Sequence, residues 1–413
     1  MPLRLIILIT AFVLIIFSMH WVFFKSAACF FDITRPRHKA ALYAAMVLLT
    51  AMVISGFLSA RTHDAWWVTG YYRIAATWMG FLVHFLAAAV AAWIVILAVH
   101  LARLPVARST VAAVFFLAAG LYSIYGIFNA FSPRVKEVPV YLEKMPAAWE
   151  NSRIVHLSDI HIGRMHGKAF AEKLVMRVNG LAPDLVVITG DIFDGLGGNF
   201  DTLVTAIDGL EAKNGVFYVS GNHEAYIGKQ RALELLKNTT MTRLDNERIE
   251  IDGLDIVGVS YPGIRAAEEI ANLPETSENG KNPRILLFHT PTSIKKPDGD
   301  RVDRHFATYW MPDTDFYHNR KIGIDLQLSG HTHHGQIFPI NLLTQMLYRG
   351  FDYGLKQSGE LQIYTTSGAG TWGPPMRTAT ISEIAVIRLR EKQTAGESNE
   401  IQSNKPKGAG HER

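Results

Sequence analysis

Ile154-Val-His-Leu-Ser-Asp-Ile-His161 is the stretch that decides the fold. Its first half is a short apolar run that predicts a strand over Ile154–Ser158, and Asp159 and His161 follow where that strand should end. In extended backbone, residues two apart share a face, so these two side chains can reach one ion. The stretch therefore predicts a strand that presents two metal ligands at its carboxyl end.

Four more motifs repeat this arrangement further along the chain. They are Gly190-Asp191-Ile-Phe-Asp194, Gly221-Asn222-His223-Glu224, Phe288-His289 and Gly330-His331-Thr-His333. Each follows a short apolar run, and ligands in open α/β sheets gather at the carboxyl ends of strands. Any one of these residues alone could be a cap, a surface group or a hydrogen-bonded core histidine. Five motifs in this order instead predict two divalent metal ions held side by side.

The residue types indicate how the ions would be held. Asp191 follows a glycine, which lets the backbone turn sharply, and one carboxylate at such a point can bridge two cations. Asn222 offers a carbonyl oxygen and His289 follows its own strand. The imidazoles of His331 and His333 can point one to each ion. Mixed nitrogen and oxygen ligands suit Mn, Fe, Zn or Co better than Ca, and a single cysteine excludes a cysteine zinc site.

The content of the site favours metal-assisted hydrolysis, most readily of a phosphate ester. Two close cations lower the pKa of a shared water and clamp both oxygens of an in-line displacement. His223, next to Asn222, is the candidate general acid or electrostatic stabiliser, although it could instead only position Asn222. Asp194 and Glu224 are candidates for orienting the ligands, or for capping a helix or turn.

The first third of the chain is apolar enough to span a membrane. Of all 413 residues, 49% are hydrophobic and only 19% are charged. Four apolar stretches approach the roughly 20 residues that a membrane helix needs, over about Leu5–Phe24, Ala40–Leu58, Met79–Leu101 and Thr110–Ala130. Aromatic residues from Trp66 to Trp78 lie between the second and third stretches, where an interfacial belt is expected. We expect a multi-pass cell-membrane protein in contact with lipids.

Basic residues give a weak indication of sidedness. Lysine and arginine lie between the first two stretches and again at Arg103 and Arg108. Placing both loops in the cytoplasm puts the domain after Ala130 on the external face. A few basic residues, such as Arg61 and Arg134, would then also be external, which weakens the indication. The net charge of +4 is too small and too diffuse to indicate nucleic acid, so no nucleic-acid partner is expected.

The rest of the chain reads as an α/β domain with a tail. We expect the divisions 1–133 (four membrane helices), 134–151 (a linker or first strand), 152–390 (the catalytic domain) and 391–413 (a disordered tail). Strands and helices alternate in the first half of the domain, and strands dominate the second. Predicted helices are Lys168–Asn179, Phe200–Lys213 and Lys229–Lys237. Further predicted strands are Leu185–Thr189, Val216–Ser220, Ile256–Ser260, Ile285–Phe288, Ile324–Ser329, Leu361–Thr366 and Ile381–Leu389.

The five motifs together resemble those of the calcineurin-like metallophosphoesterases over roughly residues 152–389. The stretches Asp325–Gln336 and Gly368–Pro374 look like the bacterial membrane-associated branch of that family. The resemblance implies a four-layer α/β/β/α sandwich with a dinuclear metal centre between the two sheets. It implies His223 as the catalytic histidine. It assigns the first metal to Asp159, His161, Asp191 and His333, and the second to Asp191, Asn222, His289 and His331.

Two departures from the branch concern the surroundings of the site. His334 stands where a small residue is usual, so it could compete for metal, contact substrate or lie at the surface. The segment 290–324 is longer than expected and carries basic and aromatic residues that could form a lid, a membrane contact or a phosphate-steering surface. These are Lys295, Lys296, Arg301, Arg304, Tyr309, Trp310 and Met311.

The leading hypothesis is a membrane-anchored phosphoesterase that uses metal-activated hydroxide against a phosphoester or pyrophosphate bond. Its substrate would be a phosphorylated small molecule or a lipid-linked compound, the latter because the domain follows the membrane helices closely. The alternative is a membrane transport or sensor protein whose hydrolase domain is regulatory. The absence of buried Asp, Glu, Lys or Arg within the apolar stretches favours an anchor. A purely structural metal domain would leave no role for His223.

Overall fold

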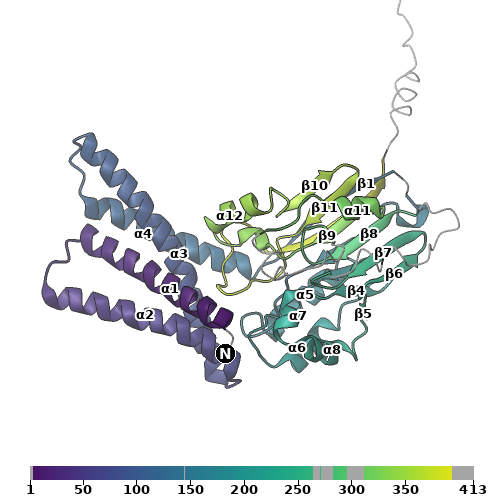
Figure 1. The fold of residues 1–413 in the computed structure, drawn as a ribbon, viewed down its shortest axis with the longest axis horizontal. Helices are drawn as coiled ribbons and strands as arrows, with labels where there is room; N and C mark the ends of the chain where they lie inside the picture. The colour runs from purple at the N-terminus through teal and green to yellow at the C-terminus, as the bar shows by residue number, and fades with distance from the viewer. Residues whose placement is uncertain (1–2, 144, 264–269, 271–281, 295–310, 393–413) are drawn as a thin grey trace, which may run out of the picture.

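The computed structural model describes residues 3–143, 145–263, 270, 282–294 and 311–392. Most of the predicted tail and residues 295–310 of the basic and aromatic segment lie outside these residues. Within them, four long helices precede two β-sheets with shorter helices around them (Figure 1). The predicted α/β class, preceded by four apolar helices, is confirmed.

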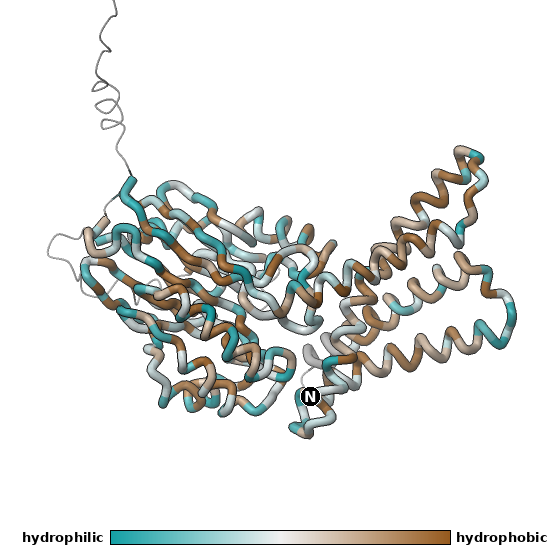
Figure 2. The backbone as a smooth tube through the Cα atoms, turned by 180° about the vertical axis from the view of Figure 1, so that it is seen from behind, coloured by the Kyte–Doolittle hydropathy of each residue, from teal (hydrophilic) through white to brown (hydrophobic). Residues whose placement is uncertain are grey.

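The four helices are α1 (Leu3–Phe30), α2 (Pro36–Thr62), α3 (Trp66–Leu101) and α4 (Arg108–Ala130). All four are long and apolar enough to cross a membrane, and hydrophobic residues run along their length (Figure 2). The loops joining α1 to α2 and α3 to α4 lie far from the sheets, whereas the start of α1 and the α2–α3 turn lie next to the α/β domain (Figure 1). The two basic loops therefore share one side, as the sequence predicts.

The aromatic residues from Trp66 to Trp78 lie within α3, not in a connecting loop. Only residues 63–65 separate α2 from α3, and α3 is 36 residues long, well beyond the roughly 20 residues needed to span a bilayer. Its first turns instead contact the α/β domain: the Arg164 guanidinium donates to Oγ1 of Thr69, and Nε of Arg73 donates to the carbonyl oxygen of Arg164. Arg164, buried just after His161, donates from its guanidinium to the carbonyl oxygens of Ala60 and His63 and to Asp64. The membrane helices thus hold the loop that follows a predicted metal ligand.

The first sheet has the strand order β1-β12-β2-β3-β4-β5 and the second β10-β11-β9-β8-β7-β6. The first comprises β1 (Arg134–Leu142), β2 (Ile154–Leu157), β3 (Leu185–Thr189), β4 (Val216–Val219), β5 (Thr242–Arg243) and β12 (Glu383–Glu391). The second comprises β6 (Glu247–Ile251), β7 (Leu254–Val259), β8 (Arg284–Phe288), β9 (Leu326–Ser329), β10 (Gly354–Ser358) and β11 (Leu361–Thr365). The central strands of both sheets are parallel, and β2, β3 and β4 are buried throughout, as parallel strands covered on both faces must be.

Alternate residues of one strand serve different cores. Ile154 packs with Ile285 and Leu326 of the second sheet, so the two sheets share a core. Val155 instead packs against α5 (Lys168–Asn179), α6 (Phe200–Ile207) and α8 (Lys229–Leu236) on the outer face of the first sheet. A third core lies on the other face of the second sheet, around Phe288 and Phe316. This alternation with a period of two is what a strand buried on both faces requires.

Most predicted elements are present with small shifts at their ends, and several polar ones are additional. Helix α6 ends at Ile207 rather than Lys213, since Asp208 and Gly209 follow it. Residues 134–142 form β1, which pairs in parallel with β12 along its whole length. Only residues 131–133 separate β1 from α4, so the domain is connected directly to the membrane helices. Elements without a sequence prediction include α7 (Asn222–Tyr226), α11 (Tyr317–Lys321) and α12 (Ile340–Leu347).

Candidate metal centre

Both sheets contribute to one cluster of polar side chains at the carboxyl ends of their strands. Asp159 and His161 follow β2, Asp191 follows β3, and Asn222 begins α7 just after β4. His289 follows β8 of the second sheet, and His331 and His333 follow β9. All seven predicted ligands are buried, none with more than 7% of its surface exposed. Segments nearly 180 residues apart in sequence thus meet at one point.

The backbone at this point is unusual. Five of the seven residues adopt the left-handed conformation, with φ of 51° at Asp159, 50° at His161, 52° at Asp191, 71° at His331 and 49° at His333. Such a conformation costs about 1–3 kcal/mol for a residue other than glycine, and it persists only where surrounding structure enforces it. Its concentration at the strand ends marks a site that the fold holds in place.

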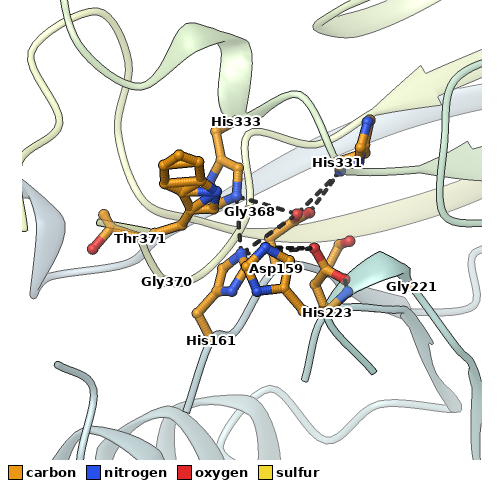
Figure 3. A network of polar contacts seen from close by, with 12 residues as sticks. Asp159, His161, Gly221, His223, His331, His333, Gly368, Gly370 and Thr371 are labelled. Carbon is orange, nitrogen blue, oxygen red and sulfur yellow. Dashed lines mark hydrogen bonds and ion pairs between the residues drawn. The ribbon is translucent and has the colours of Figure 1, made fainter. Parts of the chain in front are cut away.

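Asp159, His161 and His333 form the first half of the cluster (Figure 3). The Nε2 atoms of His161 and His333 lie 3.0 Å apart, and Nε2 of His333 lies 3.3 Å from Oδ1 of Asp159. When two ligand atoms each lie about 2.1 Å from one cation, and the ligand–metal–ligand angle is between about 90° and 109°, the two ligand atoms are about 3.0–3.4 Å apart. Two of the three separations match this range, and the third, 3.9 Å between Nε2 of His161 and Oδ1 of Asp159, corresponds to a wider angle at one cation.

Asp191, Asn222, His289 and His331 form the second half. Nε2 of His289 lies 3.2 Å from Oδ2 of Asp191 and 2.9 Å from Oδ1 of Asn222. Nδ1 of His331 lies 2.9 Å from the same asparagine oxygen. Oδ2 of Asp191 is also 3.9 Å from Nε2 of His161, so this carboxylate lies between the two halves. That position is the one a bridging ligand would occupy.

Two glycines allow the carboxylates to approach the backbone. A Cβ atom at Gly330 would lie 2.1 Å from Oδ2 of Asp159, and one at Gly221 would lie 2.2 Å from Oδ1 of Asp191. Because the carboxylates come this close, a backbone N–H group just beyond each glycine can donate to them. The N–H of His331 donates to Asp159 (2.9 Å), and the N–H of His223 donates to Asp191 (2.8 Å). Any larger residue at either glycine would displace a carboxylate.

The electrostatics favour ionised carboxylates beside neutral imidazoles. Burial opposes ionisation of Asp159, but the surrounding histidines outweigh it and hold the pKa of this carboxyl well below its usual range. Burial lowers the pKa of His331 to about 3 and also lowers the pKa of His161. His289 differs: against the effect of burial, Asp191 raises its pKa to about 9. A cation between those two groups would replace that proton, because a metal ligand must be deprotonated.

Buried groups behind the cluster orient its members. The carboxylate of Glu224 accepts from the backbone N–H groups of Asp191, Ile192 and Gly221. Nδ1–H of His223 donates to the backbone oxygen of Asp194 (2.7 Å), which turns Nε2 of His223 toward Asp191, 3.9 Å away. Burial raises the pKa of the Asp194 carboxyl to about 6. Glu224 therefore fills both predicted roles: it caps the start of α7 through Gly221 and holds the loop that carries Asp191.

Arg377 is a buried residue of the site that the sequence did not indicate. Its guanidinium donates to the carbonyl oxygen of Gly370 and contacts Nδ1 of His333 at 3.1 Å. No recognisable motif surrounds Arg377. The one sequence feature that could have indicated a buried role is a single arginine within the otherwise uncharged segment Pro374-Pro-Met-Arg-Thr378. His334 pairs with Asp352 (2.7 Å) rather than with the cluster. Met311 is exposed, and the six other named residues of the 290–324 segment lie outside the described residues.

Comparisons with known proteins identify the family. The family model for calcineurin-like phosphoesterases matches residues 152–335. A metallophosphoesterase of Helicobacter pylori strain J99 is 35% identical over 288 residues, which are 68% of this chain and 70% of that protein. A Danio rerio transmembrane protein with a metallophosphoesterase domain is 32% identical, covering 69% and 63%. An Aquifex aeolicus metallophosphoesterase is 29% identical, covering 66% and 98%.

The chain therefore belongs to the calcineurin-like phosphoesterase family and is a phosphoester hydrolase. Its four membrane-crossing helices make it a multi-pass membrane member, like the transmembrane relative. The family generally uses a dinuclear divalent metal centre, and the cluster described above supplies candidate ligands for it.

Proposed function

We propose that the seven clustered side chains hold two divalent cations and that the protein hydrolyses a phosphoester or pyrophosphate bond between them. The proposal assigns one ion to Asp159, His161, Asp191 and His333, and the other to Asp191, Asn222, His289 and His331. The observation that carries it is the 3.0 Å separation of two buried ring nitrogens, on His161 and His333. Without a metal these two nitrogens can share one N–H···N hydrogen bond, whereas a cation between them would be bound by the lone pairs of both rings.

The residues of the chain would then have separate roles in binding the metal ions, donating a proton and positioning the ligand loops. When bound, the two cations lower the pKa of a shared water and offset the charge of the phosphoryl oxygens. Asp191 holds its carboxylate between the two ligand sets. His223 keeps Nδ1–H on the backbone oxygen of Asp194, which directs Nε2 toward the leaving oxygen, and in its imidazolium form it would donate the Nε2 proton to that oxygen. Glu224 fixes the loops that carry Asp191 and Asn222.

The membrane helices support a lipid-linked phosphoester or pyrophosphate as the substrate. Three residues connect α4 to β1, which leaves the domain no long tether with which to reach away from the bilayer. We also propose that the domain lies on the external face, because the two basic loops share the far side. We delimit its catalytic part as 152–390, with β1, inside the 134–151 stretch, as its first strand. A regulatory domain on a transporter is less favoured, because the ligand set is complete.

The test uses the full chain, purified in detergent and supplied with Mn²⁺. We expect close to two metal ions per chain by elemental analysis and hydrolysis of bis(p-nitrophenyl) phosphate that a chelator abolishes. A His161→Ala/His333→Ala double variant should bind at most one ion. No more than trace metal in the folded parent protein would refute the proposal.

A further inference from the structure

A cavity of about 500 Å³ lies between the membrane helices and the metal centre. This volume falls within the range of about 300–1,000 Å³ that is usual for ligand pockets. Phe12 and Ile16 of α1 and Met79 and Val83 of α3 line one side. These residues belong to candidate membrane spans. One wall of the cavity is therefore made by helices that would lie in hydrocarbon.

The opposite wall is α12, an amphipathic helix whose apolar side chains are not covered by the domain. Leu343 and Leu347 line the cavity, and no residue of α12 is buried. Leu342 is 55% exposed and Met346 is 68% exposed. Helix α12 lies on the side of the domain that faces α3 and α4 (Figure 1). Such a helix beside membrane spans belongs at the boundary of the acyl chains.

The inner end of the cavity is the metal centre itself. His331 and His333 both line it, together with Tyr348, whose ring lies 6.4 Å from that of His331. The cavity is thus apolar where it meets the membrane helices and carries proposed metal ligands at its other end. A molecule that fits this distribution has a hydrocarbon chain and a phosphate group.

The membrane helices also fasten the loop that completes the wall. The side-chain N–H₂ of Gln336 donates to the carbonyl oxygens of Trp372 and Pro374, which are cavity residues. Further along this loop, the Oγ1 atom of Thr378 contacts Nε2 of His84 in α3 (2.9 Å). The shape of the cavity therefore depends on both parts of the chain.

We propose that this cavity binds one hydrocarbon chain of a membrane lipid while the phosphoester of the same lipid lies at the metal centre. The substrate would enter laterally from the bilayer, between α1, α3 and α12, without leaving the membrane. This inference rests on the proposed function, since the headgroup site is the proposed dinuclear centre. It adds the subsite, the part of the lipid that occupies it and the direction of entry.

The first experiment measures chain-length dependence in the full protein, reconstituted in lipid nanodiscs with Mn²⁺. The substrates are monoalkyl phosphates from ethyl to dodecyl. We expect kcat/KM to rise by about fourfold per methylene until the cavity is filled. Leu343→Trp narrows the cavity and should reduce the dodecyl-to-ethyl ratio at least about tenfold. Leu342→Trp is the matched control, because Leu342 is 55% exposed, against 44% for Leu343, and does not line the cavity. It should keep the parent ratio, which includes any effect of substrate partitioning into the bilayer.

The second experiment detects binding without catalysis. A dodecyl phosphate with a terminal diazirine is photolysed in the same nanodiscs, and its adducts are mapped by peptide mass spectrometry. We expect adducts on α1, α3 and α12, reduced about tenfold by Leu343→Trp. Adducts confined to outward residues such as Leu117 of α4, or a chain-length ratio that Leu343→Trp leaves unchanged, would overturn the inference. Adducts in the cavity without cleavage of any ester would refute the proposed function and leave the chain subsite standing.

Discussion

The two walls of the metal centre are built in opposite ways. On the side of β3 and β4, Glu224 and Asp194 anchor the ligand loops through hydrogen bonds to the backbone. On the side of α12 and Trp372, apolar side chains surround a cavity that reaches the membrane helices. A polar wall in a dry interior holds atoms to a fixed geometry, whereas an apolar wall selects mainly by size. The difference suggests that chemistry and substrate choice reside on separate walls.

The largest expected effect is on the polar wall, from Asp191→Ala. This variant removes the carboxylate that lies between the two ligand sets. Removing an outer-shell partner of a metal ligand already costs about 10–100-fold, so loss of the bridging ligand should lower kcat/KM by more than about a thousandfold. Hydrolysis assays and elemental analysis should both show the loss. Parent-like activity with full metal content would show that the wall on the side of β3 and β4 does not hold the catalytic groups.

His223→Gln should be the next largest effect, and it separates proton transfer from metal binding. We expect kcat to fall by about 10²–10⁴-fold, with the metal content of the parent. The loss should be smaller for a p-nitrophenyl ester than for an alkyl ester, because the nitrophenolate leaves without needing a proton. An equal loss for both esters, or a loss of metal, would show that His223 only positions Asn222.

The sequence predicted the polar wall and missed the apolar one, for a physical reason. Metal ligands must be particular residue types at strand ends, so Asp159, Asp191 and His289 are recognisable beside apolar runs. Arg377 contacts His333 only through tertiary folding, and nothing in its local sequence indicates that contact. The cavity depends on α1 and α12, which are more than 300 residues apart. No local sequence pattern indicates that these two helices lie beside the same cavity.

The same reasoning separates the predicted strands from the missed ones. β3 (Leu185–Thr189) is a buried apolar run, and its predicted bounds are confirmed. β6 (Glu247–Ile251) alternates charged with apolar residues at the edge of its sheet, and β10 (Gly354–Ser358) is mostly polar and exposed. Edge strands carry little burial signal, because only one side of the strand is paired.

Glu224→Gln tests the polar wall one step further from the ions. Gln keeps one acceptor oxygen but loses the charge and the second acceptor, while Glu224 now accepts from several backbone N–H groups. We expect metal affinity to fall by about 10–100-fold, with kcat largely restored at saturating Mn²⁺. Metal titration followed by assay measures both. Parent-like affinity would limit Glu224 to a structural role.

Gly126→Ala tests how firmly the apolar wall depends on the membrane helices. A Cβ at Gly126 of α4 would lie 2.6 Å from Cγ2 of Thr378, while one at Gly120 of the same helix meets nothing within 4 Å. We expect Gly126→Ala to destabilise the protein by about 1–3 kcal/mol. Gly120→Ala should have no such effect, since alanine favours a helix. Thermal unfolding in detergent compares them, and equal midpoints would show that the loop is not held by α4.

The smallest effect concerns His166, which links the two walls. Its Nε2 accepts from the backbone N–H of Thr371, beside Trp372 of the apolar wall. Burial, aided by Arg377 and Arg73, lowers its pKa from 6.5 to about 3. The unfolded chain therefore binds a proton below about pH 6.5 that the folded chain excludes until about pH 3, so stability falls as the pH falls through this window.

Between pH 7 and pH 6 the contribution of His166 should be less than about 1 kcal/mol. His166→Gln retains an acceptor for Thr371 but does not titrate. Unfolding midpoints measured across this interval should therefore depend less on pH in the variant than in the parent. An identical pH dependence would mean that His166 is hydrated or already protonated in the folded protein. The loop carrying Trp372 would then depend on its other contacts, which include Gln336, Arg377 and the backbone of Asp159.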